Sequence, residues 1–304
     1  MIEIKNLSKS FDSVKAVNDI SLNIRDKETF GLIGTNGAGK STLLRMISDV
    51  YKPDKGEIIV DGENICNNPK MKQNIFYISD EQYFFPSASP ADMIQFYMQY
   101  YPNFDTKRCF SLLDDFGLDA KRKITGFSKG MRKQFHMICG ISSGVKYLLC
   151  DETFDGLDPV MRQAVKSLIG NDMLEHGLTP IISSHNLREL EDICDCIGLL
   201  HKGGILLSDE LDNLKSNLHK VQCVFKDENS DGLLSSNVPD GIKIIYKEDR
   251  GRLLTITLEG DCELINSWFQ SLDTVFYEMI PLTLEEIFIS KTKEVGYNVK
   301  SIIF

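Results

Sequence analysis

A glycine-rich segment that runs into Lys and Ser is the part of this chain whose residue types and spacing most directly indicate chemistry. Glycines allow successive backbone N–H groups to converge on a phosphate, and the N-terminus of a following helix attracts the same anion. We expect Lys40 to neutralise phosphate charge, Ser41 to bring its hydroxyl to Mg²⁺, and Thr42 to lie near the α-phosphate. The segment predicts a polyphosphate-binding loop that consists of Gly34, Thr35, Asn36, Gly37, Ala38, Gly39, Lys40, Ser41 and Thr42.

Two adjacent carboxylates, Asp151 and Glu152, end an apolar run at residues 147–150. Neighbouring side chains on a strand face opposite sides, so the two acids should have different tasks. We expect Asp151 to hold the Mg²⁺ shell and Glu152 to lie nearer the γ-phosphate, where it polarises the attacking water. A solvated acidic turn after a buried strand is the alternative, and the phosphate-binding loop favours the catalytic interpretation.

These motifs need a scaffold of alternating strands and helices. Residues 29–33 form a short apolar run suited to a buried strand, and residues 43–47 continue the loop as a helix. Strand and turn signals alternate to about residue 89, residues 90–145 are mostly helical, and strands and helices alternate again to about residue 210. The pattern predicts an α/β core over residues 1–210 with a helical subdomain at about 90–145.

A separate domain is expected over residues 211–304, where these motifs stop. Apolar runs predict four strands with a hairpin turn at 247–252, and residues 263–272 have a helical pattern. The order favours a small α+β domain of the ferredoxin-like split βαβ kind, with a role in dimer support or regulation. The expected strands are residues 221–225, 242–246, 253–258 and 275–277.

Composition narrows the class of protein. The chain has 304 residues, 42% of them hydrophobic, which is enough for a sizeable core. Its formal net charge of -10 argues against sequence-independent binding to nucleic acid. No apolar run reaches the roughly 18 residues that a membrane helix needs, and no basic-then-apolar leader is present. The eight cysteines form no CxxC pair, which favours reduced thiols and a cytosolic compartment.

Three further segments resemble the ATP-binding-cassette (ABC) transporter ATPases. The family's signature motif is similar to residues 127–134, its D-loop to residues 156–159, and its switch histidine to His185. The resemblance spans about residues 1–210. It implies that Phe11 stacks on adenine with Val17 beneath it, that Asp158 belongs to the D-loop, and that His185 contacts the γ-phosphate.

The same resemblance implies that Ser128 and Gly130 close on an ATP molecule held by an opposing subunit. Both residues lie where a helix is expected to begin, and an ordinary Ser N-cap is the simpler interpretation of this position. The two interpretations are compatible. For Phe11, packing in a loop beside a strand is the alternative, and for His185 a structural role after a strand.

Departures from the family pattern concern the signature and the Q-loop. Lys129 and Met131 replace the usual Gly and Gln, a variant similar to that of antibiotic, peptide and drug exporters. Asp80 occupies the expected Q-loop position, where its contact with Mg²⁺ or water is weakened or taken over by Glu81 or Gln82. Aromatic residues are dense between 76 and 104, and they are expected to divide between a helical core and a groove for a cytoplasmic helix of the membrane subunit.

The sequence thus predicts the ATP-hydrolysing subunit of an ABC exporter, with ATP and Mg²⁺ as cofactors. We expect a cytoplasmic protein at the inner face of the cell membrane, attached only through a separate transmembrane permease and paired with a second ATPase subunit. A catalytically weak partner of a heterodimer and a soluble ABC ATPase without a transport role are the alternatives. The sequence leaves the choice between homodimer and heterodimer open.

Overall fold

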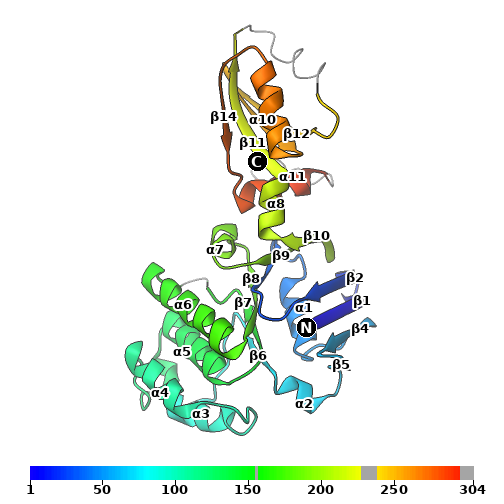
Figure 1. Cartoon of the computed structure of the whole chain (residues 1–304). Helices are drawn as coiled ribbons and strands as arrows, with labels where there is room; N and C mark the ends of the chain where they lie inside the picture. The colour runs from blue at the N-terminus through cyan, green and yellow to red at the C-terminus, as the bar shows by residue number, and fades with distance from the viewer. Residues whose placement is uncertain (155–156, 227–237, 295–304) are drawn as a thin grey trace. The chain divides into compact units, whose positions relative to one another are not determined.

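A computed structural model describes residues 1–154, 157–226 and 238–294 of the chain (Figure 1). Contacts divide the chain into two compact units, Met1–Ser208 and Asp209–Phe304, which we describe separately. The division lies beside the predicted boundary at residue 210. Gly156 of the expected D-loop lies outside the described residues.

A six-stranded sheet forms the centre of the first unit, in the order β10-β9-β3-β8-β7-β6. Neighbouring strands pair in parallel from β9 to β6, and every residue of β3, β7 and β8 is buried. Parallel strands have their carboxyl ends at one edge, so the segments that follow them converge there. The strands are β3 (Phe30–Gly34), β6 (Ile75–Ile78), β7 (Tyr147–Asp151), β8 (Thr179–Ser184), β9 (Cys196–His201) and β10 (Gly204–Glu210).

A second, four-stranded sheet has the order β2-β1-β4-β5 and antiparallel pairing. Its apolar side chains share one core with helix α1 (Lys40–Ile47) and with residues of the central sheet such as Leu32 and Leu149. This packing holds α1 between the two sheets. The strands are β1 (Ile2–Phe11), β2 (Val14–Ile24), β4 (Lys55–Val60) and β5 (Glu63–Asn64).

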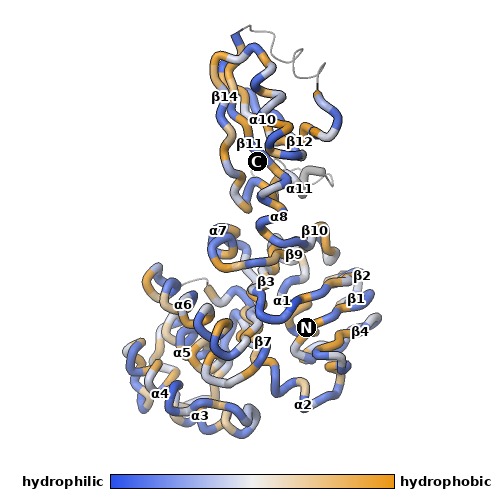
Figure 2. The backbone as a smooth tube through the Cα atoms, viewed as in Figure 1, coloured by the Kyte–Doolittle hydropathy of each residue, from blue (hydrophilic) through white to orange (hydrophobic). Residues whose placement is uncertain are grey.

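Helices occupy residues 90–142, as the sequence predicted. Ser89 and Asp92 form a reciprocal capping box at the start of α3, and Asp105 caps α4. Helix α5 is buried from Lys133 to Ser142, and Figure 2 shows hydrophobic stretches along it, whereas α2 (Pro69–Lys72) is largely hydrophilic. These elements are α3 (Pro90–Tyr97), α4 (Thr106–Asp115), the 3₁₀ helix η1 (Ile124–Gly126) and α5 (Lys129–Ser142).

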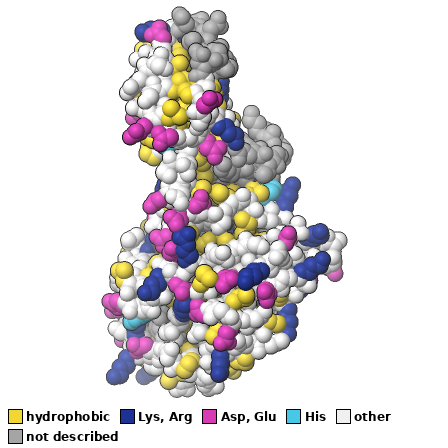
Figure 3. All heavy atoms as spheres, turned by 45° about the vertical axis from the view of Figure 1, so that its right-hand side comes forward, with side chains coloured by type: hydrophobic (Ala, Val, Ile, Leu, Met, Phe, Trp, Pro, Cys, Tyr) yellow, Lys and Arg dark blue, Asp and Glu magenta, His cyan; other side chains and the backbone are white. Residues whose placement is uncertain are grey.

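The remaining helices of this unit connect strands. Helix α6 has a Pro at its first position and ends at Gly177, whose φ of 69° suits a left-handed C-cap. They are α2 (Pro69–Lys72), α6 (Pro159–His176) and α7 (Leu187–Glu191). On the face seen in Figure 3, Lys and Arg side chains are interspersed with Asp and Glu over this unit.

The second unit is a four-stranded antiparallel sheet in the order β12-β13-β11-β14, packed against α10. The predicted hairpin turn narrows to residues 251–252, where Gly251 has a φ of 71°. The strand order and directions agree with a split βαβ arrangement. Most of the connection between β11 and β12 lies outside the described residues, so the ferredoxin-like assignment stays a prediction.

The elements of the second unit follow the expected segments closely. They are α8 (Leu211–Asn217), β11 (Leu218–Phe225), β12 (Lys243–Arg250), β13 (Leu253–Glu259), α10 (Cys262–Ser271), β14 (Thr274–Ile280) and α11 (Leu284–Glu294). Among the described residues of the whole chain, none of the helices combines the length and the apolar character that a bilayer crossing demands.

Candidate active site

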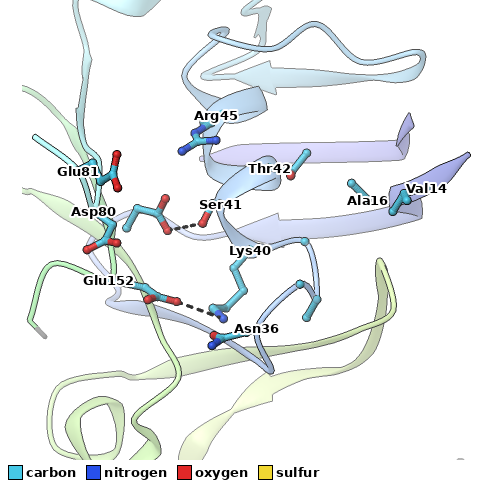
Figure 4. Close-up of a pocket in the computed structure, with 14 residues that line it drawn as sticks. Val14, Ala16, Asn36, Lys40, Ser41, Thr42, Arg45, Asp80, Glu81 and Glu152 are labelled. Atoms are coloured by element: carbon cyan, nitrogen blue, oxygen red, sulfur yellow. Dashed lines mark hydrogen bonds and ion pairs between the residues drawn. The ribbon is translucent and has the colours of Figure 1, made fainter. Parts of the chain in front are cut away.

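The glycine-rich segment connects β3 to α1 and opens into a pocket of about 630 Å³ (Figure 4). Gly39 is the N-cap of α1 with a φ of 108°, and the helix has no side-chain cap. A Cβ atom on Gly39 would lie 2.3 Å from the carbonyl oxygen of Ala16, so only glycine fits. The uncapped helix start therefore presents backbone N–H groups toward the pocket, which suits a phosphate.

The pocket brings together most of the residues that the sequence singled out. Its lining includes most of the loop, the acids of the Q-loop segment and the two acids after β7, and it adds three residues that the sequence did not indicate, Val14, Ala16 and Arg45. It is lined by Val14, Ala16, Asn36, Gly37, Ala38, Gly39, Lys40, Ser41, Thr42, Arg45, Asp80, Glu81, Asp151 and Glu152.

Lys40 is buried at the centre of this site. Its ammonium donates to the carbonyl oxygens of Gly34 at 2.8 Å and Thr35 at 3.4 Å, and it lies 3.5 Å from a carboxylate oxygen of Glu152. Gly34 and Thr35 do not line the pocket. Their carbonyl groups hold the Lys40 ammonium, which faces the pocket.

Asp151 accepts hydrogen bonds from three hydroxyl groups. Ser41 donates at 2.9 Å, Ser183 at 2.8 Å and Tyr77 at 3.0 Å. Burial and then the Asp151 charge raise the pKa of Tyr77, while the Arg45 guanidinium beside it acts in the opposite direction. Tyr77 thus remains a hydroxyl donor at physiological pH, and the carboxylate is held in one orientation.

This oxygen set fits a hard divalent cation. Mg²⁺ prefers one or two protein oxygen ligands together with substrate phosphates and water. Ser41 and Asp151 lie within hydrogen-bond distance of each other at the edge of the phosphate pocket. They are the residues that would hold Mg²⁺, and the ion would supply charge neutralisation for the phosphates.

Glu152 follows directly and lies between two cationic or proton-carrying groups. One carboxylate oxygen is 3.5 Å from Lys40 Nζ, and the other is 3.5 Å from His185 Nδ1. Its φ of 48° is unusual for a residue with a side chain. His185 follows β8 and is half exposed, so the carboxylate bridges the phosphate loop and the segment after a neighbouring strand.

The two expected adenine contacts differ in outcome. Phe11 is 40% exposed, and its ring packs edge-on against Tyr51 with centroids 5.3 Å apart. Its strand partner Val14 lines the pocket, but Phe11 itself does not, so base stacking stays a prediction.

Val17 does not contact the pocket. Its side chain is 1% exposed and packs in the core, whereas Ala16 lines the pocket. Adjacent side chains of a strand face opposite sides, and burial of the larger apolar side chain, Val17, in the core is the more favourable arrangement. Ala16 is therefore the residue of this pair that faces the pocket, and the expected contact of Val17 with the base stays a prediction.

Ser128 and Asp158 are helix caps. The Ser128 hydroxyl accepts from the Met131 N–H at 3.1 Å at the start of α5, and Asp158 accepts from the N–H groups of Val160 and Met161 at the start of α6. Ser128 is exposed, Gly130 is half-buried, and neither lines the pocket of its own chain. Their expected contact with a nucleotide on another subunit stays a prediction.

Asp80 lines the pocket and also forms an ion pair with Lys133, at 3.1 Å. Gln82 does not take the place of Asp80 in the pocket lining. Its amide donates to the backbone carbonyls of Ser79 and Asp80 at 2.8 and 2.9 Å and holds the loop in shape.

The pocket residues that sequence reasoning missed carry a weak signal. Arg45 lies one helical turn after Ser41 on α1, so both occupy one face. Val14 and Ala16 lie on one face of β2 and Val17 on the other. Which face meets the pocket depends on the register shifts between β1 and β2, and the sequence does not predict where these occur. Tyr77 and Ser183 belong to buried apolar strands, where no motif distinguishes them.

Comparisons with known proteins agree with this geometry. A family model described as ABC transporter matches residues 17–155. The ABC transporter ATP-binding protein YtrB of Bacillus subtilis is 31% identical over 291 residues, which cover 96% of this chain and 98% of YtrB. The bacitracin transport ATP-binding protein BcrA of Bacillus licheniformis is 26% identical over 297 residues, 92% of this chain and 97% of BcrA. The lantibiotic transport ATP-binding protein SrtF of Streptococcus pyogenes is 31% identical over 214 residues, 70% of this chain and 92% of SrtF.

Solved structures share the fold of the first unit. An ATP-binding subunit of an ABC transporter superposes with a TM-score of 0.66 at 25% identity and covers 71% of this chain and 92% of its own. The dimeric structure of MJ0796, a bacterial ABC transporter cassette, superposes with a TM-score of 0.64 at 20% identity over 69% of this chain and 99% of its own.

Proposed function

Because the chain belongs to the ATP-binding subunits of ABC transporters, and is an ATP hydrolase of that family, we propose that it powers an exporter. In this proposal, two cassettes bind MgATP between them, and its hydrolysis drives a permease in the membrane.

The position of Glu152 carries the catalytic part of the proposal. Its carboxylate lies at the edge of the phosphate pocket, with Lys40 and His185 at 3.5 Å on either side. We infer that it is the general base that accepts a proton from the attacking water. Lys40 neutralises phosphate charge, and His185 contacts the γ-phosphate and steadies the water.

A second cassette supplies the remaining contacts in this proposal. Ser128 and Gly130 lie at the exposed start of α5, where a hydroxyl and backbone N–H groups are available to an anion. A single chain carries one such helix start, and its own pocket does not include it. We infer a composite site in which each nucleotide meets Ser128 of the opposing copy.

Export is the finer part of the proposal. The Lys129 and Met131 variant of the signature resembles that of antibiotic and peptide exporters. The similarity to the bacitracin transport protein also continues through the second unit, since it covers 92% of this chain, whereas the match to SrtF covers 70%. A shared accessory unit favours a shared transport class.

The permease is the expected membrane partner, and the aromatic segment supports a docking role. Phe76 is buried, whereas Tyr83, Phe85 and Tyr100 are exposed. Exposed aromatic side chains are frequent anchors for a helix that docks in a groove. We infer that these three receive a cytoplasmic helix of the permease, which would keep the chain at the inner face of the membrane.

Hydrolysis by the chain co-purified with its membrane partner tests the catalytic assignment. We expect Glu152→Gln to bind MgATP normally and to lower the vanadate-sensitive turnover by about 10² to 10⁴-fold. Lys40→Ala should instead weaken nucleotide binding, because it removes the cation that faces the phosphates. Wild-type turnover in Glu152→Gln contradicts the role of Glu152, and recovery of activity without any membrane protein favours the soluble ABC ATPase alternative.

The direction of transport is tested in inside-out membrane vesicles that contain the complex, with MgATP added outside. We expect accumulation of a peptide antibiotic such as bacitracin or a lantibiotic in vesicles with the wild-type chain and none with Glu152→Gln. Uptake confined to right-side-out vesicles that are loaded with MgATP inside, where the ATPase then lies, indicates import instead.

A catalytically weak partner role in a heterodimer is the second candidate, since Asp80 and Lys129 depart from the usual pattern. The complete set of Lys40, Asp151 and Glu152 around one pocket favours the active enzyme. Purified chain that turns over only when a different cassette protein is added supports this second candidate.

A further inference from the structure

A buried lysine on α5 connects the helical region to the catalytic carboxylate. The Lys133 side chain is 1% exposed, and its ammonium donates to the backbone carbonyl of Glu152 at 2.8 Å and to the carboxylate of Asp80 at 3.1 Å. A buried charge is costly unless it is paired and hydrogen-bonded, so this position selects a specific arrangement of its neighbours.

The carbonyl that Lys133 holds belongs to a residue with an unusual backbone. Glu152 has a φ of 48°, a left-handed conformation that is unfavourable for a residue with a side chain. Its N–H donates to the carbonyl and the hydroxyl oxygen of Ser183, each at 3.1 Å. Lys133 therefore fixes the peptide group on one side of Glu152 while β8 fixes the other, and together they set the direction of the side chain.

The second contact explains what Asp80 does in this chain. Its loop is braced by Gln82 and by Ser79, whose hydroxyl donates to the Glu81 carbonyl at 2.6 Å. This bracing directs the Asp80 carboxylate at Lys133, although the Asp80 side chain is 44% exposed and also lines the phosphate pocket. An ionised Asp supplies the counter-charge that a Gln at this position lacks.

We propose that Lys133 is a positioning residue for ATP hydrolysis, which orients Glu152 through its backbone carbonyl, and that Asp80 holds Lys133 in place. The inference depends on the role of Glu152 given above. A misplacement of a catalytic group by about 1 Å costs roughly 10²-fold in rate, so loss of this link should affect turnover more than nucleotide binding.

The test uses the full chain in complex with its membrane partner and compares turnover with MgATP affinity. We expect Lys133→Met, which keeps the length of the side chain and removes its charge, to lower kcat by about 10- to 100-fold. Its affinity for MgATP should stay within about threefold of wild type, since the residue does not line the pocket. Lys133→Arg should recover part of kcat, because it restores a cation with hydrogen-bond donors.

Two combined variants separate positioning from a merely structural role. In a Glu152→Gln background, Lys133→Met should cause no further loss of turnover, because both act on one step. Asp80→Asn should lower kcat by about 3- to 10-fold, and it should add nothing to Lys133→Met. If Lys133→Met fails to fold, Asp80→Asn tests the same link, because substitution of the partly exposed Asp80 side chain is expected to leave the fold intact.

Folded Lys133→Met with kcat within about twofold of wild type overturns the proposal, as does a loss of MgATP affinity equal to the loss of kcat. Losses that multiply with Glu152→Gln also overturn it. These outcomes differ from failure of the proposed function, in which the wild-type complex lacks hydrolysis or hydrolyses ATP independently of Glu152.

Discussion

Backbone conformation at single residues decides how the phosphate pocket is built. Gly39 adopts a φ of 108° at the start of α1 and lies against the Ala16 carbonyl, while Glu152 adopts a φ of 48° at the end of β7. The first position requires glycine for two reasons, conformation and space. The second accepts the conformational cost of a side chain, as expected where the direction of a carboxylate matters.

Gly39→Ala tests the close approach of the phosphate loop to β2. An added Cβ meets the Ala16 carbonyl oxygen at 2.3 Å, so the loop has to move. We expect the affinity for MgATP, measured by titration calorimetry, to fall at least about tenfold, which corresponds to about 1.4 kcal/mol.

Gly62→Ala is the matched control, because Gly62 has a φ of 84° but no heavy atom within 4 Å of an added Cβ. It should lower the free energy of unfolding by about 1–2 kcal/mol and leave MgATP affinity unchanged. Equal effects of the two substitutions on affinity argue against a steric role for Gly39.

Among the elements, α5 links the candidate site to the helical region. Ser128 is its N-cap, Lys133 lies in its second turn, and its buried stretch contains His136 among the rings of Phe76, Phe84 and Tyr97. Burial lowers the pKa of His136 to about 4. Within the described part of the chain, its Nδ1 atom has no hydrogen-bond partner, so the packing of α5 depends on a neutral imidazole.

The stability of this element should therefore decrease in acid. His136 binds a proton with a pKa near 6.5 when unfolded and about 4 when folded, so the stabilisation is present above pH 6.5 and is lost as the pH falls toward 4. We expect His136→Phe to reduce the drop in unfolding free energy between pH 7.5 and 4.5 by about 2–3 kcal/mol.

Far-UV circular dichroism in denaturant, or hydrogen exchange on α5, measures this change. Fluorescence of the single tryptophan, Trp268, is unsuitable because that residue lies in the second unit. His176→Gln, at an exposed position, is the control and should keep the wild-type drop. The same drop in His136→Phe as in the control contradicts the assignment to His136.

At the scale of the whole molecule, the proposed function depends on a second copy or a homologous cassette. The pocket of this chain gathers the phosphate loop and the acids but not the start of α5. In a symmetric dimer, we therefore expect each site to combine Glu152 of one copy with Ser128 of the other. Two differently damaged copies can then restore one intact site.

Mixing two inactive variants tests this arrangement. Ser128→Arg and Glu152→Gln should each abolish most hydrolysis alone. An equal mixture should recover up to about a quarter of wild-type turnover, because half of the dimers are mixed and each has one intact site.

The pairs of one variant with itself are the internal controls, and the readout is vanadate-sensitive phosphate release after subunit exchange. An absence of recovery in folded, exchanged dimers contradicts a composite site between identical copies. Recovery that requires a different cassette protein indicates a heterodimer.

The sequence by itself determined the parts of this protein that depend on neighbours in the chain. The glycine spacing, the apolar runs that became β3 and β7, and the position of Asp151 and Glu152 at a strand end are local properties, and the structure has them at the expected residues. The parallel order of the strands then brings these ends to one edge.

Only the tertiary structure decided which side chains meet there. The packing of β2 turned Val17 into the core and Ala16 to the pocket, and the hydroxyl groups of Tyr77 and Ser183 reached Asp151 from two other strands. Lys133 meets Asp80 and Glu152 across 53 and 19 residues of sequence. Such contacts depend on strand register and helix packing over long separations, which the local pattern of residues does not encode.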